Sequence, residues 1–173
     1  MNSEERRLVI MDLLRKSSQP VSASVLAGKL NVSRQVIVGD VALLRSAGET
    51  IMATPRGYLF GREHDGIVHQ IAVKHTSDET EAELNAIVDQ GCTVKDVIVE
   101  HPLYGQLTGS LQLSSRYDVS QFISRCREAD AKPLSELTGG IHLHTVSCPD
   151  EASFARVLDD LKKLSFLLED PED

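Results

Sequence analysis

Two histidines stand two residues apart in a segment whose pattern predicts a β-strand. The segment 141–147 (IHLHTVS) contains His142 and His144. Because residues i and i+2 of a strand lie on the same face, both imidazoles are expected to point the same way. Two imidazole nitrogens on one face commonly hold a metal ion. The alternative is a solvent-facing row of an antiparallel strand, and the spacing alone favours neither interpretation.

A third histidine and a carboxylate could complete such a site. His75 ends the predicted strand 67–75, and Glu83 follows eight residues later in a predicted helix over 78–90. Three imidazoles and one carboxylate suit zinc, nickel, iron or manganese, and the sequence does not select among these metals.

The other three histidines have less defined contexts. His101 precedes a proline at the end of a predicted strand, close to Tyr104. It either stabilises the turn or forms hydrogen bonds in a ligand pocket, with Tyr104 as a stacking wall. His64 lies in a predicted linker and is expected to be solvated, and His69 has no evident role.

The elements that would position these residues form the C-terminal two thirds of the chain. They are strand 67–75, helix 78–90, strands 94–101 and 106–113, helix 118–129, strand 141–147, a helix from 150 to about 163, and a short strand at 165–168. This order predicts an α+β domain, with helices on one face of an antiparallel or mixed sheet. The polar segment 61–66 (GREHDG) is the expected boundary, which gives domains 1–62 and 63–173.

The N-terminal segment predicts a winged helix-turn-helix. Helices are expected over 4–16, 23–30 and about 34–46, followed by strands at 50–54 and 58–60. Ser22 and Ser33 are the expected N-caps, and Gly48 is the expected left-handed end of the third helix. The inward positions are expected to be Val25, Leu26, Leu30, Val36, Ile37, Val41 and Leu44.

The third helix carries residues that suit DNA recognition. Ser33, Arg34 and Gln35 stand at its N-terminus, where arginine can bind guanine and glutamine can bind adenine. Arg45 could contact the backbone where the helix leaves the groove, and Arg56 stands at the tip of the predicted wing. The alternative is a protein-docking module in which the arginines form salt bridges.

Gly39 lies inside the same predicted helix. Glycine there costs about 1 kcal/mol relative to alanine, so close packing is the expected compensation.

The charges are distributed unevenly along the chain. Residues 1–62 contain nine Lys/Arg and five Asp/Glu, a net charge of +4, whereas 63–173 contain nine and twenty-one, a net charge of −12. A basic segment can meet phosphates while an acidic domain repels them.

No apolar run approaches the roughly 20 residues that span a bilayer, and no signal peptide is evident, so a cytoplasmic protein is expected. The three cysteines are widely spaced without a CxxC motif, so they are expected to be free thiols. No Ser/His/Asp pattern, HExxH motif or glycine-rich phosphate loop predicts an enzyme.

These segments together resemble the niacin-responsive transcriptional repressors. The segment NVSRQVIVGDVALLRSAGETIMATPRGYLF resembles the winged helix of that family. The segments VKH (73–75), VIVEHPLYGQLTG (97–109) and GGIHLHTV (139–146) resemble its three-histidine regulatory domain.

The resemblance implies a homodimeric repressor of genes for NAD biosynthesis or niacin uptake, which binds paired half-sites on double-stranded DNA. It implies nicotinic acid as the effector and a divalent metal, nickel or zinc above all. The ligands then fall on His75, Glu83, His142 and His144, with Glu81 as the rival carboxylate and His101 as a candidate effector contact. Gly39 stands where a basic residue is expected. The alternatives are a metalloregulator that responds to the metal itself and a metal-dependent enzyme fused to a DNA-binding domain.

Overall fold

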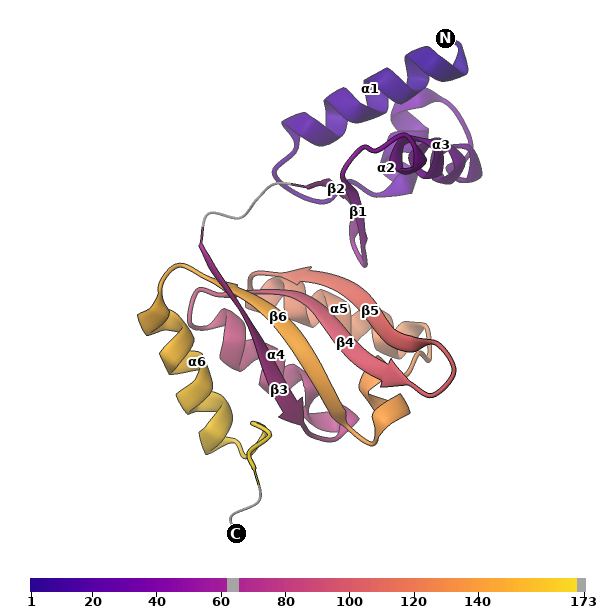
Figure 1. The fold of residues 1–173 in the computed structure, drawn as a ribbon. Coiled ribbons are helices and arrows are strands. Elements are labelled where there is room, and N and C mark those ends of the chain that lie inside the picture. Colours follow the sequence, from indigo (N-terminus) through magenta and orange to yellow (C-terminus); the bar gives the residue numbers. More distant parts are fainter. Residues whose placement is uncertain (62–65, 171–173) are drawn as a thin grey trace. The chain divides into compact units, whose positions relative to one another are not determined.

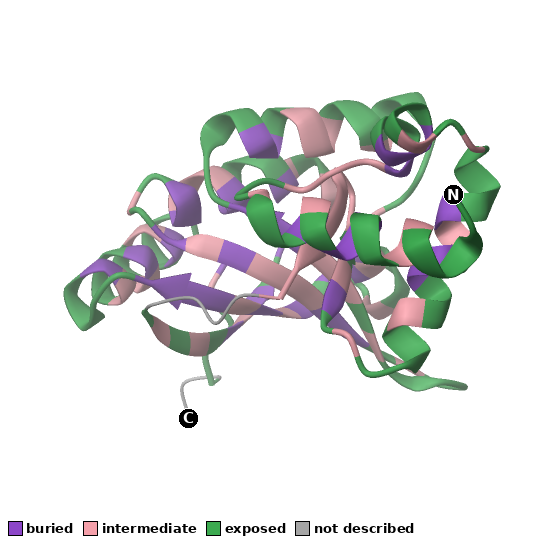
Figure 2. Cartoon of the chain, turned by 90° about the horizontal axis from the view of Figure 1, so that it is seen from above, coloured by how far each residue is buried: buried purple, intermediate pink, exposed green. Residues whose placement is uncertain are grey.

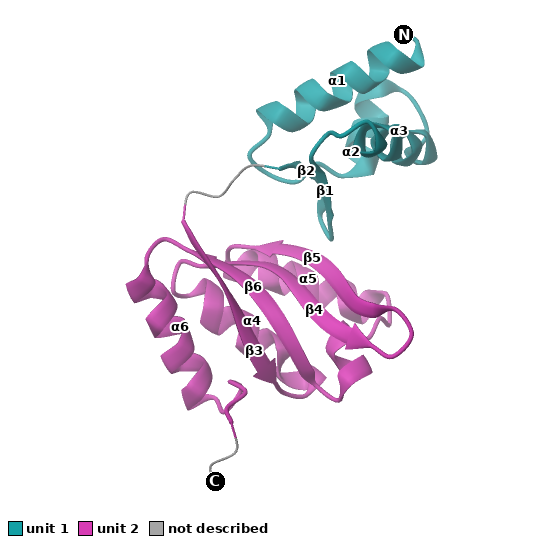
Figure 3. Ribbon diagram, viewed as in Figure 1, with its two compact units in different colours: residues 1–63 teal, residues 64–173 magenta. Residues whose placement is uncertain are grey.

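The computed structural model describes residues 1–61 and 66–170 (Figure 1). The chain forms two compact units, Met1–Glu63 and His64–Asp173 (Figure 3). The predicted domain boundary after residue 62, and His64 in the predicted linker, lie outside the described residues.

The N-terminal unit contains three helices and a two-stranded antiparallel hairpin. These are α1 (Ser3–Lys16), α2 (Ala23–Leu30), α3 (Arg34–Ser46), β1 (Ile51–Thr54) and β2 (Gly57–Phe60). The expected caps are present. The Ser22 hydroxyl accepts from the Val25 N–H at 3.1 Å, and the Ser33 hydroxyl accepts from the Val36 N–H at 3.3 Å. Gly48 has a φ of 97°, so the third helix ends in the left-handed conformation that was expected.

The buried face of these helices is narrower than the sequence pattern indicates. Leu26 and Ile37 are fully buried, but Val25 is 49% exposed and Val36 is 37% exposed, so the inward placement of both valines was wrong. Each valine immediately precedes a core residue and is therefore turned by about 100° from it around the helix axis. The core of this unit consists of Ile10, Met11, Leu14, Ala23, Leu26, Ala27, Ile37, Val41 and Ile51.

A buried carboxylate joins the first helix to the third. Asp40 is 4% exposed and accepts from Arg6 Nε at 2.5 Å and from Arg6 Nη2 at 3.1 Å. Arg7 Nη1 lies 3.6 Å from the same carboxylate. Two of the basic residues in this unit therefore compensate an internal charge, and the net charge of residues 1–62 overstates what is available to phosphates.

Gly39 is exposed, and the expected close packing around it was wrong. Among the described residues, a Cβ added at Gly39 would meet no atom within 4 Å. Close packing within the described part of this unit therefore does not explain the glycine.

The C-terminal unit contains a four-stranded sheet and three α-helices. They are β3 (Ile67–Lys74), α4 (Thr80–Val88), β4 (Thr93–His101), β5 (Gly105–Leu113), α5 (Arg116–Glu128), β6 (Ile141–Cys148) and α6 (Glu151–Lys163). Short 3₁₀ segments occur at Ser77–Glu79 and Leu134–Thr138. The strand order is β3-β6-β4-β5 and every pair is antiparallel, so the predicted α+β class is confirmed. The short strand expected at 165–168 is only a single bridge between Val73 and Leu167.

The three helices cover one face of this sheet, and their buried side chains share one core. Residues from α4, α5 and α6 form this core together with residues of the strands. Figure 2 marks the buried residues of the helices and strands in purple. On β6 the side chains that face this core are His142, His144, Val146 and Cys148. The strand therefore carries its two histidines toward the helix layer rather than toward solvent.

The expectation of three free thiols was wrong. Cys92 and Cys148 form a disulfide, and both are buried. The register of β4 with β6 pairs Thr93 with Ser147, so the residues just beyond this pair meet although they lie 56 positions apart in the chain. Cys126 is the free cysteine.

Among residues 1–61 and 66–170, no helix has the length and apolar character needed to cross a bilayer.

Candidate metal centre and nucleic-acid interface

Three histidines and one glutamate meet where β3, β6 and α4 pack together. In the register of the two strands, Ile71 pairs with His144 and Val73 with His142. His75 follows two residues after Val73 and therefore lies on the same face. Glu83 belongs to the first half of α4 and points from the helix layer into this group.

The Glu83 carboxylate is the centre of the group. Oε2 lies 2.5 Å from His75 Nε2, and Oε1 lies 3.2 Å from His142 Nε2 and 2.8 Å from His144 Nε2. The His142 ring is nearly perpendicular to its neighbours, at 4.8 Å from the His75 ring and from the His144 ring. All three Nε2 atoms therefore converge on one carboxylate.

Backbone carbonyls fix which ring nitrogen carries the proton. His75 Nδ1 lies 2.7 Å from the Thr76 oxygen, His142 Nδ1 lies 2.9 Å from the Gly140 oxygen, and His144 Nδ1 lies 2.6 Å from the Asp96 oxygen. A carbonyl can only accept, so each Nδ1–H donates. A neutral histidine bonded this way presents an Nε2 lone pair, which is the arrangement of metal-ligating histidines.

The arrangement requires positive charge at its centre. Three lone pairs and a carboxylate repel one another unless protons or a metal ion lie between them. His144 Nε2 is buried, and among the described residues it has no aligned hydrogen-bond partner, although Glu83 Oε1 is only 2.8 Å away. Ligand atoms of His75, Glu83 and His142 lie within 4.8 Å of one another. The donor set therefore fits a divalent transition metal.

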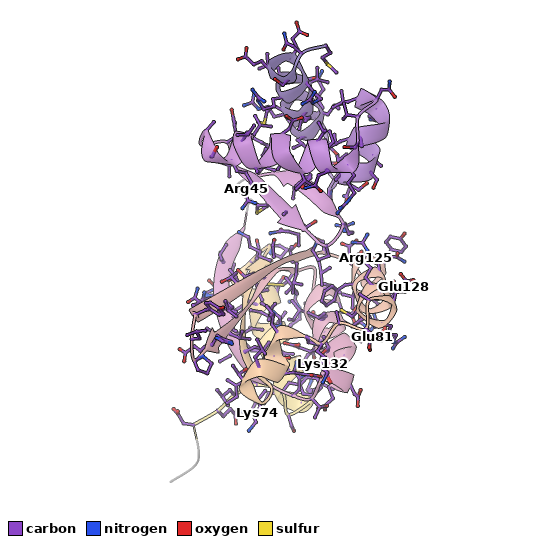
Figure 4. The ribbon with its side chains drawn as sticks, turned by 90° about the vertical axis from the view of Figure 1, so that its right-hand side faces the viewer. Arg45, Lys74, Glu81, Arg125, Glu128 and Lys132 are labelled. Carbon is purple, nitrogen blue, oxygen red and sulfur yellow. A yellow bond between two sulfur atoms is a disulfide. The ribbon has the colours of Figure 1, made fainter. Side chains whose placement is uncertain are left out.

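The centre is closed to solvent. The side chains of His75, Glu83, His142 and His144 are between 0% and 3% exposed. Glu81, which lies on α4 like Glu83, is exposed in contrast (Figure 4). Of the two carboxylates that the sequence offered, the structure brings Glu83 into the histidine group.

Burial and charge act in opposite directions on these groups. Burial would lower the pKa of His75 and of His144, but the Glu83 carboxylate outweighs it, so both pKa values are raised. Burial would raise the pKa of Glu83, but the histidines hold it well below its ordinary value. In the metal-free protein the cluster is therefore held together by histidine protons.

A pH dependence of stability follows for the metal-free protein. The histidines whose pKa is raised by folding stabilise the folded state. This stabilisation is complete below about pH 6.5, the pKa of histidine in the unfolded chain, and it is lost as the pH rises through the pKa values of the folded protein. The Glu83 contribution is present above about pH 4.3 and is lost only as the pH falls toward its lowered folded value. The Tm of metal-free protein is therefore expected to fall between about pH 6 and pH 8.

The measurement is thermal unfolding at constant ionic strength with a chelator, compared with protein loaded with Ni²⁺ or Zn²⁺. A metal ion replaces the protons, so the gain in Tm on loading should grow with pH. A metal-free Tm that rises over the same pH range would contradict this assignment of the protons.

Gly140 contributes to the site in a way that residue types alone do not indicate. Its φ is 96°, and a Cβ there would overlap the His75 carbonyl oxygen. Only glycine allows the chain before β6 to pass this close to His75 while its own carbonyl orients His142.

A cavity of about 530 Å³ borders the histidine group on the side of His75. Its lining consists of Lys74, His75, Thr76, Ser77, Glu79, Ser135, Glu136, Gly139 and Gly140. This volume is within the range of small-molecule sites.

The hydrogen bonds at His101 are those of a turn. His101 Nδ1 accepts from the backbone N–H groups of Leu103 at 3.1 Å and Tyr104 at 3.2 Å. The Tyr104 ring lies 5.0 Å from the His101 ring and is 71% exposed. Neither residue is among the described residues that line the cavity beside His75. Their effector role stays a prediction.

His69 has a local structural context. Its ring stacks on Phe154 at 4.1 Å, and Nε2 lies 3.0 Å from Glu151 Oε1. It thereby ties β3 to the first turn of α6.

The candidate DNA-contacting residues lie on two elements of the N-terminal unit, α3 with its N-cap and the β1–β2 hairpin. Arg34 and Gln35 are exposed in the first turn of α3, beside the Ser33 cap, and Arg45 is exposed in its last turn (Figure 4). Arg56 is half-buried, and its Nη1 donates to Gln19 Oε1 at 3.4 Å rather than extending from the hairpin. The structure thus exposes the predicted contacts on α3 more fully than the predicted contact on the wing.

Comparison with known proteins assigns both halves of the chain. Residues 6–59 match the model of an HTH domain, and residues 68–170 match the model of the 3H domain. The probable transcription repressor NiaR of Thermotoga maritima is 45% identical over 167 residues, which cover 96% of this chain and 95% of that protein. The transcription repressor NadR of Bacillus subtilis is 41% identical over 169 residues, 95% of this chain and 94% of that protein.

Proposed function

The chain belongs to the niacin-responsive transcription repressors that join an HTH domain to a 3H domain, and from this premise we propose that nicotinic acid and a bound metal control its affinity for operator DNA. It is a DNA-binding repressor with a regulatory domain. The observation that carries the proposal is the convergence of three Nε2 atoms on the buried Glu83. We place this activity in the cytoplasm, on the control regions of genes for NAD biosynthesis or niacin uptake.

We propose that His75, Glu83, His142 and His144 hold a divalent transition metal, Ni²⁺ or Zn²⁺ first, with Fe²⁺ or Mn²⁺ as weaker candidates. When bound, the ion would supply the positive charge that the histidine protons supply in the metal-free protein. The residues of this chain orient the ligands and connect the surrounding elements. The carbonyls of Thr76, Gly140 and Asp96 orient the rings, and the ligands connect β3, β6 and α4.

The cavity beside His75 is the best-supported place for the effector. Nicotinate is a flat anion, and the described lining offers it the exposed Lys74 beside the carboxylates of Glu79 and Glu136. Because the metal ligands are almost inaccessible, the cavity offers nicotinate a place beside the centre rather than on it. A ligand there would contact the segments on both sides of the histidine group, after β3 and before β6.

The regulation is a population shift. Nicotinate has to prefer the conformation that binds DNA, since a ligand with equal affinity for both conformations changes nothing. In the homodimer that we propose, this conformation places two copies of α3 about 34 Å apart, one turn of DNA. Ser33, Arg34 and Gln35 then face base edges, and Arg45 and Arg56 face the backbone or minor groove.

A metalloregulator is the second candidate, and one observation favours it. The side chains of the four proposed ligands are between 0% and 3% exposed, which favours the ion over an organic molecule as the group that they recognise. In that case the metal itself would be the regulatory ligand.

The test measures DNA affinity with the metal held constant. A duplex that the protein selects from a pool randomised over about 30 base pairs is long enough for two half-sites. Saturating nicotinate is expected to tighten binding to that duplex by about 5- to 150-fold, the usual range of allosteric coupling. Nicotinamide, which lacks the carboxylate, is the matched control ligand.

Each outcome separates the candidates. A response to Ni²⁺ or Zn²⁺ without any response to nicotinate would support the metalloregulator. The absence of any preferred duplex, or of salt-sensitive binding, would overturn both candidates.

A further inference from the structure

His144 differs from the other two histidines of the group in the source of its backbone acceptor. For the other two, the acceptor is a carbonyl within two residues along the chain and outside the strands. For His144 it is the Asp96 carbonyl, which belongs to the neighbouring strand β4. In a regular antiparallel pair, strand carbonyls bond to N–H groups of the next strand. Some feature of β4 must therefore free the Asp96 carbonyl for the ring.

The pairing of β4 with β6 is interrupted at this point. The pairs on either side of the interruption are Val94 with Val146 and Ile98 with Leu143. Between them, the three β4 residues 95–97 lie against the two β6 residues 144 and 145. One extra residue in one strand of an antiparallel pair is a β-bulge, and bulges often re-aim groups beside functional sites.

Asp96 contacts β6 through two different acceptors. Its backbone oxygen lies 2.6 Å from His144 Nδ1, and its Oδ1 accepts from the Thr145 N–H at 2.9 Å. If the register at Ile98 continued for two residues, Asp96 would lie opposite Thr145, and its backbone oxygen would be the expected acceptor of that N–H. The carboxylate therefore does at this position what a strand carbonyl would ordinarily do.

The exchange of acceptors keeps both hydrogen bonds. β6 is an inner strand of the sheet, where a backbone N–H is costly to leave unpaired. Without an acceptor on the side chain at position 96, the Thr145 N–H would compete with His144 for one backbone oxygen. With the carboxylate present, the carbonyl can hold the His144 ring, whose Nε2 lies 2.8 Å from Glu83 Oε1.

We propose that Asp96 is a positioning residue for the metal ligand His144. Its carboxylate takes the Thr145 N–H, and its carbonyl is thereby free to orient the His144 ring with Nε2 toward the centre. This role needs an acceptor oxygen on the side chain and no negative charge. The inference rests on the proposed metal centre, in which His144 is a ligand.

The experiment compares three variants of the full-length protein. Asp96→Ala removes the acceptor, whereas Asp96→Asn keeps Oδ1 and removes only the charge. Glu100→Ala is the matched control, because it removes an exposed carboxylate from the same strand, four residues further along.

Only Asp96→Ala is expected to lose metal affinity. It should raise the Kd for Zn²⁺ about 10- to 100-fold, the usual effect of losing a group that orients a metal ligand. Asp96→Asn and Glu100→Ala should change the Kd by less than about threefold, since both keep the acceptor beside Thr145. Equal losses in Asp96→Ala and Asp96→Asn would show that the charge acts instead of the acceptor, and would overturn the inference.

A measurement on metal-free wild-type protein does not depend on whether a variant folds. NMR couplings transmitted across hydrogen bonds identify the acceptor of a backbone N–H. The Thr145 nitrogen should couple to the side-chain carboxyl carbon of Asp96. A coupling to the backbone carbonyl carbon of Asp96 would refute the exchange of acceptors.

The outcomes distinguish this inference from the proposed function. Wild-type protein that binds neither Zn²⁺ nor Ni²⁺ would refute the metal centre, while the Thr145 coupling would still decide which acceptor Asp96 offers to β6. If Zn²⁺ binds and Asp96→Ala keeps the wild-type affinity, the inference about Asp96 alone is refuted.

Discussion

Glu83→Gln is expected to lower the affinity for Ni²⁺ or Zn²⁺ by at least about a hundredfold. Even changes to groups that only support metal ligands cost 10- to 100-fold, and this one removes the negative charge of the central ligand. Glutamine keeps the volume of the side chain, and its amide can donate to an Nε2 lone pair of the histidines. The variant should therefore fold, and the loss should appear in binding rather than in secondary structure.

Glu81→Gln is the matched control, two residues away on the same helix and exposed. Equilibrium dialysis with metal analysis gives the affinities, and circular dichroism verifies the fold. Wild-type affinity in Glu83→Gln would show that the carboxylate in the histidine group is not a ligand. An equal loss in Glu81→Gln would show that the loss is not specific to Glu83. In the same variant, any nicotinate effect that depends on metal should disappear.

Arg34→Ala is expected to weaken binding to the selected duplex by about 5- to 150-fold, which corresponds to one lost bidentate base contact. Arg34 is exposed in the first turn of α3, where the Ser33 cap fixes the start of the helix. The affinity of the Arg34→Ala variant for a duplex of unrelated sequence should differ much less from the wild-type affinity. The measurement is fluorescence anisotropy with both duplexes at one fixed salt concentration.

Variants at two further arginines serve as comparisons for this result. Arg125→Ala removes the same charge from an exposed position on α5 and should leave both affinities unchanged (Figure 4). Arg45→Ala should lower the affinity for both duplexes to the same extent. It should also reduce the slope of log affinity against log salt concentration by about one, the contribution of one phosphate contact. Equal effects of Arg34→Ala on the two duplexes would make Arg34 a phosphate contact instead of a base-reading residue.

The local features of this chain were predictable because they depend on neighbouring residues. Ser22 and Ser33 cap their helices through hydrogen bonds that span three positions. The strand period placed His142 and His144 on one face without any knowledge of the rest of the sheet.

The features that were missed depend on register and on orientation within the fold. Cys92 and Cys148 meet because β4 and β6 pair, and the sequence does not state which strands are neighbours. The buried Asp40 has its partner Arg6 only because α1 packs against α3, and the sequence does not state that contact. The carbonyls that orient the histidines belong to the backbone, so no residue type indicates them.

The sealed histidine group has a consequence for how the protein would acquire its ion. The proposed ligands come from three segments that span residues 75 to 144, and together they are almost inaccessible once the unit is folded. Exchange of a bound ion would require a local opening of the unit around these residues, which is slow compared with diffusion. The identity of the ion would then be decided during synthesis, by the metal that was available when the chain closed around it.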